Sequence, residues 1–122
     1  MNSKIYNELI KASTEDHYKS LDFVKTKYFQ SLYKSTLDTI YTSITSGGCI
    51  FTCGNGGSFS DSQHFTAELM VRYARDRNPF SSITLGCNPS NLSACSNDYS
   101  YKEIFKREYQ ALSKDKDLLI AI

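Results

Sequence analysis

The stretch GGCIFTCGNGGS at residues 47–58 decides the fold, because it joins a short apolar run to a glycine-rich turn. Residues 49–53 lack proline and are rich in β-formers, which predicts a buried strand. The sequence SFSD at residues 58–61 fits the capping-box pattern, which predicts that a helix begins at Ser58. A strand, a glycine turn and a helix N-terminus favour an anionic ligand, because first-turn N–H groups have no partner within the helix. We therefore expect a phosphate-bearing small molecule, although many such turns bind nothing.

Length and composition indicate at most one domain of an ordinary globular protein. The chain has 122 residues, of which 40% are hydrophobic and 22% charged, with a net charge of +1. This balance favours neither nucleic acid nor an anionic membrane as a partner. The sequence has no apolar stretch of about 18 residues and no signal-peptide pattern, so we expect a cytoplasmic protein. The four cysteines form no Cys-x-x-Cys pair and are expected to be buried, reduced thiols.

Helical spacing of apolar residues characterises the first part of the chain. Residues 3–45 contain no proline or glycine, and their pattern predicts two helices with a break within residues 26–30. Gly47-Gly48 would end the second helix, so residues 1–46 are interpreted as an N-terminal helical segment. Its aromatic side chains exceed what one helix face buries. Either a partner subunit covers them, or the tyrosines lie at the surface.

Strands and helices alternate over residues 47–122, which predicts a parallel sheet of the doubly wound α/β type. The expected elements are a strand at 49–53, a helix at 58–75 with a break at 77–79, a strand at 82–85, a short helix at 88–95, a turn at 97–100, a helix at 101–113 and a strand at 118–122. The last run is wholly apolar, which favours a central strand. Because ligands bind at the loops after such strands, we expect a further loop after Ile122 and an absent C-terminal part. The alternative is a compact domain that ends on an edge strand.

Polar residues after the glycine turn carry the candidate chemistry. His64 and Glu68 stand at positions i and i+4 of the expected helix, so their Cβ atoms lie about 5–6 Å apart on one face. This spacing suits a shared metal ion, and it also suits a carboxylate base beside an electrophile. Arg72 follows one turn later, where it would hold a phosphate or sugar hydroxyls. The alternative is a solvated ion pair, which is the commoner meaning of an isolated pair with this spacing.

Asn97 and Asp98 follow the second strand–helix unit and are expected near the same edge of the sheet. Either side chain would hydrogen-bond sugar hydroxyls. Asn-Asp is also ordinary turn chemistry, so a simple turn is the alternative.

These residues resemble the sugar isomerase (SIS) domain family, and within it the phosphoheptose isomerases. The resemblance rests on CGNGGS at 53–58 followed by H-x-x-x-E at 64–68, a combination more specific than either part. It continues through SNDY at 96–99 and DLLIAI at 117–122, so it covers nearly the whole chain. It implies a flavodoxin-like α/β fold preceded by two helices, with residues 47–122 as the N-terminal portion of the SIS domain.

The resemblance also implies an activity and a site. The reaction is the conversion of sedoheptulose 7-phosphate to D-glycero-D-manno-heptose 7-phosphate for bacterial lipopolysaccharide or capsule, by a homotetramer with sites between subunits. Glu68 would transfer the proton through an enediol, and His64 and Glu68 would be zinc ligands. The implied substrate contacts are Asn55, Gly56, Gly57, Ser58, Glu68, Arg72, Asn97 and Asp98.

Two other functions stay open. One is a non-catalytic SIS module that binds a sugar phosphate or a replication-initiator protein, and the other is an isomerase of hexose or pentose phosphates. Modules of the initiator-binding type share Gly-Asn-Gly and Gln-His-Phe but lack a carboxylate at the position of Glu68, so Glu68 favours the enzyme. The family's serine-rich phosphate loop and its later Gln and His would follow Ile122. We therefore expect these 122 residues alone not to be catalytically competent.

Overall fold

The computed structural model describes residues 3–122, which divide into two compact units. The first unit ends at Asp38, and the second is Thr39–Ile122. The division falls within helix α2 (Lys27–Thr45), so the last turns of α2 belong to the second unit. Among the described residues, no helix is both long enough and apolar enough to cross a membrane.

Helix α1 (Ser3–Val24) and the beginning of α2 make up the described part of the first unit. The two predicted helices are confirmed, and Thr26 explains the break between them. Its hydroxyl donates to the Phe23 carbonyl over 2.7 Å and accepts the Phe29 N–H over 3.2 Å, so it caps the N-terminus of α2. No residue of α1 is buried, and many large apolar side chains of α1 and α2 are exposed.

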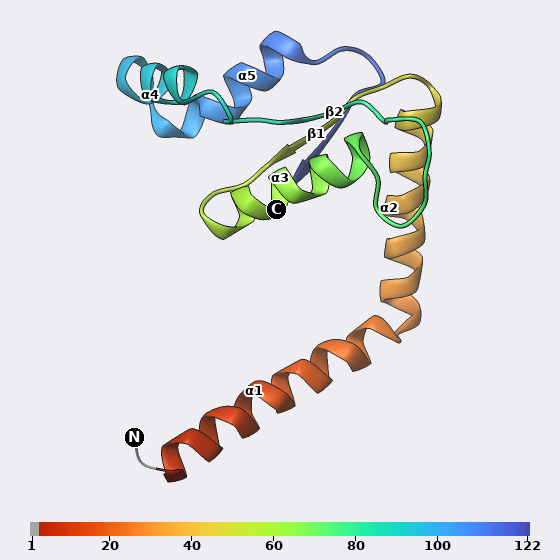
Figure 1. The fold of residues 1–122 in the computed structure, drawn as a ribbon, viewed down its shortest axis with the longest axis vertical. Coiled ribbons are helices and arrows are strands. Elements are labelled where there is room, and N and C mark those ends of the chain that lie inside the picture. The colour runs from red at the N-terminus through yellow and green to blue at the C-terminus, as the bar shows by residue number, and fades with distance from the viewer. Residues whose placement is uncertain (1–2) are drawn as a thin grey trace. The chain divides into compact units, whose positions relative to one another are not determined.

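The second unit is built on a parallel three-stranded sheet of order β2-β1-β3 (Figure 1). Its strands are β1 (Ile50–Cys53), β2 (Ser82–Thr84) and β3 (Leu118–Ala121), each within its predicted range. Strand β1 is central, and all four of its residues are buried. An order in which the first strand lies between the second and third is that of flavodoxin-like sheets, so the predicted fold class is confirmed.

Strand β3 lies at an edge of the described sheet, where its apolar sequence favoured a central position. Its residues alternate between half-buried and exposed, because within residues 3–122 only β1 pairs with it. Asp117 fixes where β3 begins. Its Oδ1 accepts the Cys49 N–H and its Oδ2 accepts the Lys114 N–H, each over 2.7 Å.

Helices cover both faces of this sheet, with α3 (Gly57–Met70) on one face and α4 (Pro89–Asp98) and α5 (Ile104–Leu112) on the other (Figure 1). The α5 face is apolar. The rings of Phe51 and Tyr109 meet edge to face with their centroids 5.2 Å apart, and the other members of this cluster are Cys49, Cys53, Leu85 and Phe105. Burial of such surface supplies most of the free energy that holds α5 on the sheet.

The α3 face carries hydroxyl groups beside the buried side chain of Ile50, which points to the same face of β1 as Thr52. Thr52 Oγ1 lies 3.0 Å from the hydroxyl oxygens of both Thr66 and Thr84, and 3.1 Å from the carbonyl oxygen of Ser62. The Ser82 hydroxyl donates to Thr66 over 3.2 Å. These bonds link β1 and β2 to two turns of α3, so they fix how far α3 is rotated and shifted on the sheet.

Two helix boundaries on the α5 side differ from the prediction. Helix α4 extends to Asp98, so the turn expected at 97–100 begins later than predicted. Asn88 caps its beginning by accepting the N–H groups of Ser90 and Asn91. The helix expected at 101–113 begins as the 3-10 turn η1 (Tyr101–Glu103) and becomes α-helical from residue 104.

The four cysteines are free thiols, as predicted. Cys53 is buried, and burial raises the pKa of its thiol. Cys49 and Cys95 are half-buried, but Cys87 is exposed. The expectation of burial is wrong for Cys87 because it lies in the turn after β2 and not in the strand.

Candidate functional site

The glycine turn connects the end of β1 to the beginning of α3. A Cβ atom on Gly54 would lie 2.5 Å from the Ser58 carbonyl oxygen, so the first turn of α3 passes too close for any side chain at this position. Gly56 is the N-cap of α3 with φ 57°, a left-handed conformation that favours glycine. The chain therefore enters the helix at Gly57, and the predicted capping box is wrong because Ser58 already lies inside the first turn.

A hollow of about 200 Å³ opens beside this turn, at the carboxyl ends of β1 and β2. Ligands of open α/β sheets bind at this end of the strands. Asn55 is exposed there, and its Oδ1 accepts the Tyr101 hydroxyl proton over 2.5 Å. The lining residues are Gly54, Asn55, Gly56, Phe59, Gly86, Leu92, Tyr101 and Phe105.

His64 and Glu68 lie on one face of α3, as their spacing predicted. His64 Nε2 and Glu68 Oε1 are 3.0 Å apart. The imidazole is 76% exposed and the carboxylate 32% exposed, so a ligand reaches both groups from solvent. Within residues 3–122, no group of three or more His, Cys, Asp or Glu side chains converges as a metal site does. The pair therefore supplies two donor atoms, one nitrogen and one oxygen.

The glycine turn and Glu68 lie near opposite ends of α3. Glu68 lies ten positions after Ser58, which corresponds to about 15 Å along a helix axis. The chain thus presents the turn and the His64–Glu68 pair on the same helix without bringing them together.

Arg72 does not lie on the helix face where the sequence placed it. Helix α3 ends at Met70, and Arg72 follows as an exposed residue outside any helix. The helix thus ends five residues before its predicted end, and Arg77 folds back onto its last turn. Arg77 Nη2 donates to the Glu68 carbonyl over 2.6 Å and Nη1 donates to the Leu69 carbonyl over 2.8 Å. A cation in this position also interacts favourably with the negative end of the helix dipole.

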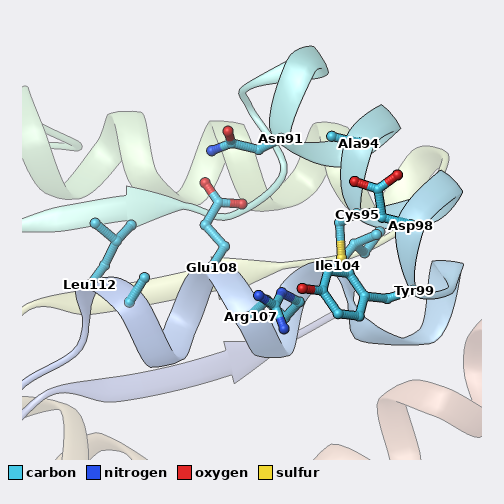
Figure 2. A pocket seen from close by; sticks show the side chains of 10 residues that line it. Asn91, Ala94, Cys95, Asp98, Tyr99, Ile104, Arg107, Glu108 and Leu112 are labelled. Atoms are coloured by element: carbon cyan, nitrogen blue, oxygen red, sulfur yellow. The ribbon is translucent and has the colours of Figure 1, made fainter.

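Asn97 and Asp98 lie on the last turn of α4, where Asn97 Nδ2 donates to Asp98 Oδ1 over 2.9 Å. Asp98 lines a cavity of about 380 Å³ between α4 and α5, apart from the hollow that holds Asn55 (Figure 2). Arg107 stacks on the Tyr99 ring 3.9 Å from its centroid at the Asp98 end of this cavity (Figure 2).

Sequence reasoning missed three residues that shape these sites. Tyr101 reaches Asn55, Arg77 caps α3, and Glu108 Oε2 accepts the Gly86 N–H over 2.7 Å. The partners of Tyr101 and Glu108 are 46 and 22 residues away, so no local spacing predicts them. Arg77 carried a weak signal, because a basic residue shortly after a helix commonly binds its last carbonyls.

The comparison with known families decides what this fold is. A family model described as SIS domain matches residues 16–122.

The chain belongs to the SIS domain family.

Several relatives that the chain matches are named phosphoheptose isomerase. The protein of Shewanella halifaxensis (strain HAW-EB4) is 49% identical over 79 residues, which cover 65% of this chain and 40% of that protein. The protein of Helicobacter pylori (strain ATCC 700392 / 26695) is 39% identical over 116 residues, covering 95% of this chain and 60% of that protein. The chain thus spans about half the length of these relatives.

Solved structures agree with the fold. A phosphoheptose isomerase from Neisseria gonorrhoeae superposes with a TM-score of 0.80 at 24% identity, over 95% of this chain and 59% of that one. A phosphoheptose isomerase from Francisella tularensis superposes with a TM-score of 0.59 at 28% identity, over 84% of this chain and 60% of that one. The flavodoxin-like SIS fold derived above is the fold of these proteins.

Proposed function

We propose that the natural full-length protein is a phosphoheptose isomerase, which converts sedoheptulose 7-phosphate to D-glycero-D-manno-heptose 7-phosphate in the bacterial cytoplasm. The product would enter lipopolysaccharide or capsule synthesis. The observation that carries the proposal is the accessible His64–Glu68 pair on the helix that the glycine turn begins. The relatives' name, phosphoheptose isomerase, supports a heptose phosphate as the substrate.

Glu68 is the proposed proton-transfer residue. Its carboxylate removes a proton from C1 of the open-chain ketose, while a second acid–base group, supplied by the rest of the protein, protonates the C2 carbonyl oxygen and an enediol forms. Glu68 then delivers its proton to C2, and the O1 hydroxyl returns a proton to the second acid–base group as the C1 aldehyde forms. The 32% exposure of the Glu68 side chain suits this role, because the carboxylate is reachable but not fully hydrated.

Zinc is the proposed metal, and the donor set fits part of a site. An imidazole nitrogen and a carboxylate oxygen are ordinary zinc ligands, and His64 Nε2 and Glu68 Oε1 are close enough to share one ion. A zinc site needs at least one more protein ligand, which another segment of the full-length protein or another subunit would supply. When bound, zinc would polarise the sugar carbonyl as a Lewis acid.

The substrate contacts proposed are those that the SIS resemblance implies. Asn55 to Ser58 would contact the reacting end of the sugar, with Arg72, Asn97 and Asp98 as further contacts. We also propose that the protein is a homotetramer. The separation of about 15 Å between the glycine turn and Glu68 supports sites completed by a second subunit. The exposed apolar side chains of α1 and α2 support an assembly that covers them.

A substrate panel tests the proposal most simply. The full-length protein is assayed with sedoheptulose 7-phosphate, a ketohexose phosphate and a ketopentose phosphate. We expect the highest kcat/KM with the heptulose. A preference for a shorter sugar would make the protein a different sugar-phosphate isomerase. Binding without turnover of any of the three would indicate a non-catalytic SIS module.

The metal is tested on the two histidines of the chain. Zinc content per subunit is measured for the full-length parent, His64→Ala and His17→Ala. His17 is an exposed residue of α1, so it serves as the matched control. We expect zinc to be lost from His64→Ala and retained in His17→Ala. Equal zinc content in the two variants would exclude His64 as a ligand.

A further inference from the structure

Asn55 and Tyr101 reach the hollow from two separate connections. Asn55 lies in the turn between β1 and α3, and Tyr101 begins η1, which packs against both α4 and α5. The Tyr101 hydroxyl donates to Asn55 Oδ1 over 2.5 Å, a short distance for a hydrogen bond of this type. This bond joins the glycine turn to the helices on the other face of the sheet.

An asparagine amide has an acceptor at one end and two donors at the other. An exposed amide without a fixed partner rotates and presents either end to a ligand. Here the Tyr101 hydroxyl donates to Oδ1, which leaves both Nδ2 protons available to an acceptor on a ligand. The sugar carbonyl and a phosphate oxygen accept hydrogen bonds but do not donate them, so they require this orientation.

The Tyr101 ring is well placed to hold its hydroxyl still. Tyr101 belongs to a short 3-10 turn, in which the Glu103 N–H donates to the Ser100 carbonyl over 3.1 Å. The ring lines the same hollow as Phe59 and Phe105, and Tyr101 is 55% exposed, so the bond is open to solvent on one side. A hydroxyl carried on a ring has few rotamers, which lowers the entropy lost when it binds the amide.

We propose that Tyr101 is a positioning residue, whose hydroxyl holds Asn55 with Nδ2 directed at an acceptor oxygen of the sugar phosphate. This inference rests on the proposed isomerase function for its substrate. Tyr101 itself takes no part in the proton transfer.

Kinetics of the full-length protein with sedoheptulose 7-phosphate test the pair. Tyr101→Phe keeps the ring and removes the hydroxyl, so we expect KM to rise about three- to tenfold, the worth of one hydrogen bond, with kcat nearly unchanged. Asn55→Ala should raise KM at least as much, and adding Tyr101→Phe to it should raise KM no further. The matched control is Tyr99→Phe. The Tyr99 ring stacks on Arg107 and lines the cavity between α4 and α5, not the hollow beside the glycine turn. This variant should behave as the parent.

Unchanged KM in Tyr101→Phe, or KM effects of the two substitutions that multiply in the double variant, would overturn the proposal. A second readout needs no turnover. The side-chain ¹⁵N amide signal of Asn55 should show restricted motion in the parent and in Tyr99→Phe, and averaging in Tyr101→Phe. Equal restriction in all three proteins would also overturn it. If the parent fails to isomerise the heptulose but this amide loosens in Tyr101→Phe, the positioning holds and the proposed substrate fails.

Discussion

The two faces of the sheet are held by different forces. On the α5 face, Phe51 packs on Tyr109 within an apolar cluster. On the α3 face, Thr52 joins Thr66 and Thr84 through hydroxyl groups about 3 Å apart. Apolar contact is non-directional, whereas a hydrogen bond fixes distance and angle. The face that carries the His64–Glu68 pair is therefore the face whose helix position is set by directional bonds.

The two faces of the sheet are expected to differ in what a substitution changes: the stability of the fold on the α5 face, and the position of α3 on the other. We expect substitutions on the α5 face to change mainly the free energy of unfolding. Substitutions on the α3 face should change that free energy less, and should change the activity of the full-length protein more, because they let α3 shift with Glu68 on it.

The largest expected effect follows from breaking the apolar face. Phe51→Ala removes a ring that is 1% exposed and leaves a cavity beneath Tyr109. The free energy of unfolding should fall by about 3–5 kcal/mol, measured by urea titration of the full-length protein. Phe51→Leu refills most of the space, so it should lower the free energy of unfolding clearly less. Equal losses from the two variants would mean that packing at Phe51 is not what stabilises this face.

Removing a hydroxyl group from the α3 face should lower the free energy of unfolding by less than Phe51→Ala does. Thr52→Val keeps the side-chain volume but deprives Thr66 and Thr84 of a partner, so we expect a loss of about 1–3 kcal/mol in the free energy of unfolding. Thr52→Ser keeps the hydroxyl and should retain more of the activity than Thr52→Val at a temperature where both remain folded. If the valine variant is the more active of the two, hydroxyl bonding does not position α3.

The end of α3 offers a smaller and more local effect. Arg77→Met keeps an unbranched apolar side chain but removes the guanidinium, which binds the carbonyls of Glu68 and Leu69 and stacks on the Phe80 ring. We expect a loss of about 1–2 kcal/mol in the free energy of unfolding. Backbone amide hydrogen exchange in the last turn of α3 should speed up. Exchange that is unchanged there would contradict the capping role, and Arg72→Met, outside the helix, is the matched control.

The smallest expected effect is a pH dependence on the α5 face. Burial raises the pKa of the Cys53 thiol above its ordinary value of 9.0, so the folded protein keeps this proton where the unfolded chain loses it. The stabilisation is complete below the ordinary pKa and is lost as the pH rises through the folded value. Between about pH 8 and pH 10, the free energy of unfolding should fall less steeply in Cys53→Ala than in the parent. Cys87→Ala, at an exposed thiol, should keep the parent slope.

The sequence predicted the sheet and the helix order because periodicity and glycine positions are local signals. It predicted that His64 and Glu68 share a face for the same reason, since a spacing of four residues is a property of any helix. The sequence predicted the helix ends less well, because residues distant in sequence bind there. Arg77 binds the last carbonyls of α3, and Tyr101 reaches Asn55 across 46 residues of sequence. The hydroxyl cluster carries no local signal, because Thr52, Thr66 and Thr84 lie on three elements that only the fold brings together.

The most direct test of the central claim is the isomerisation of sedoheptulose 7-phosphate by the full-length protein and by its Glu68→Gln variant. Product formation is followed by NMR, and substrate binding is measured separately by calorimetry. The account predicts that the parent forms the heptose phosphate, whereas the glutamine variant binds the substrate and does not turn it over. Turnover by Glu68→Gln at the parent rate would contradict it, because Glu68 would not be the residue that moves the proton.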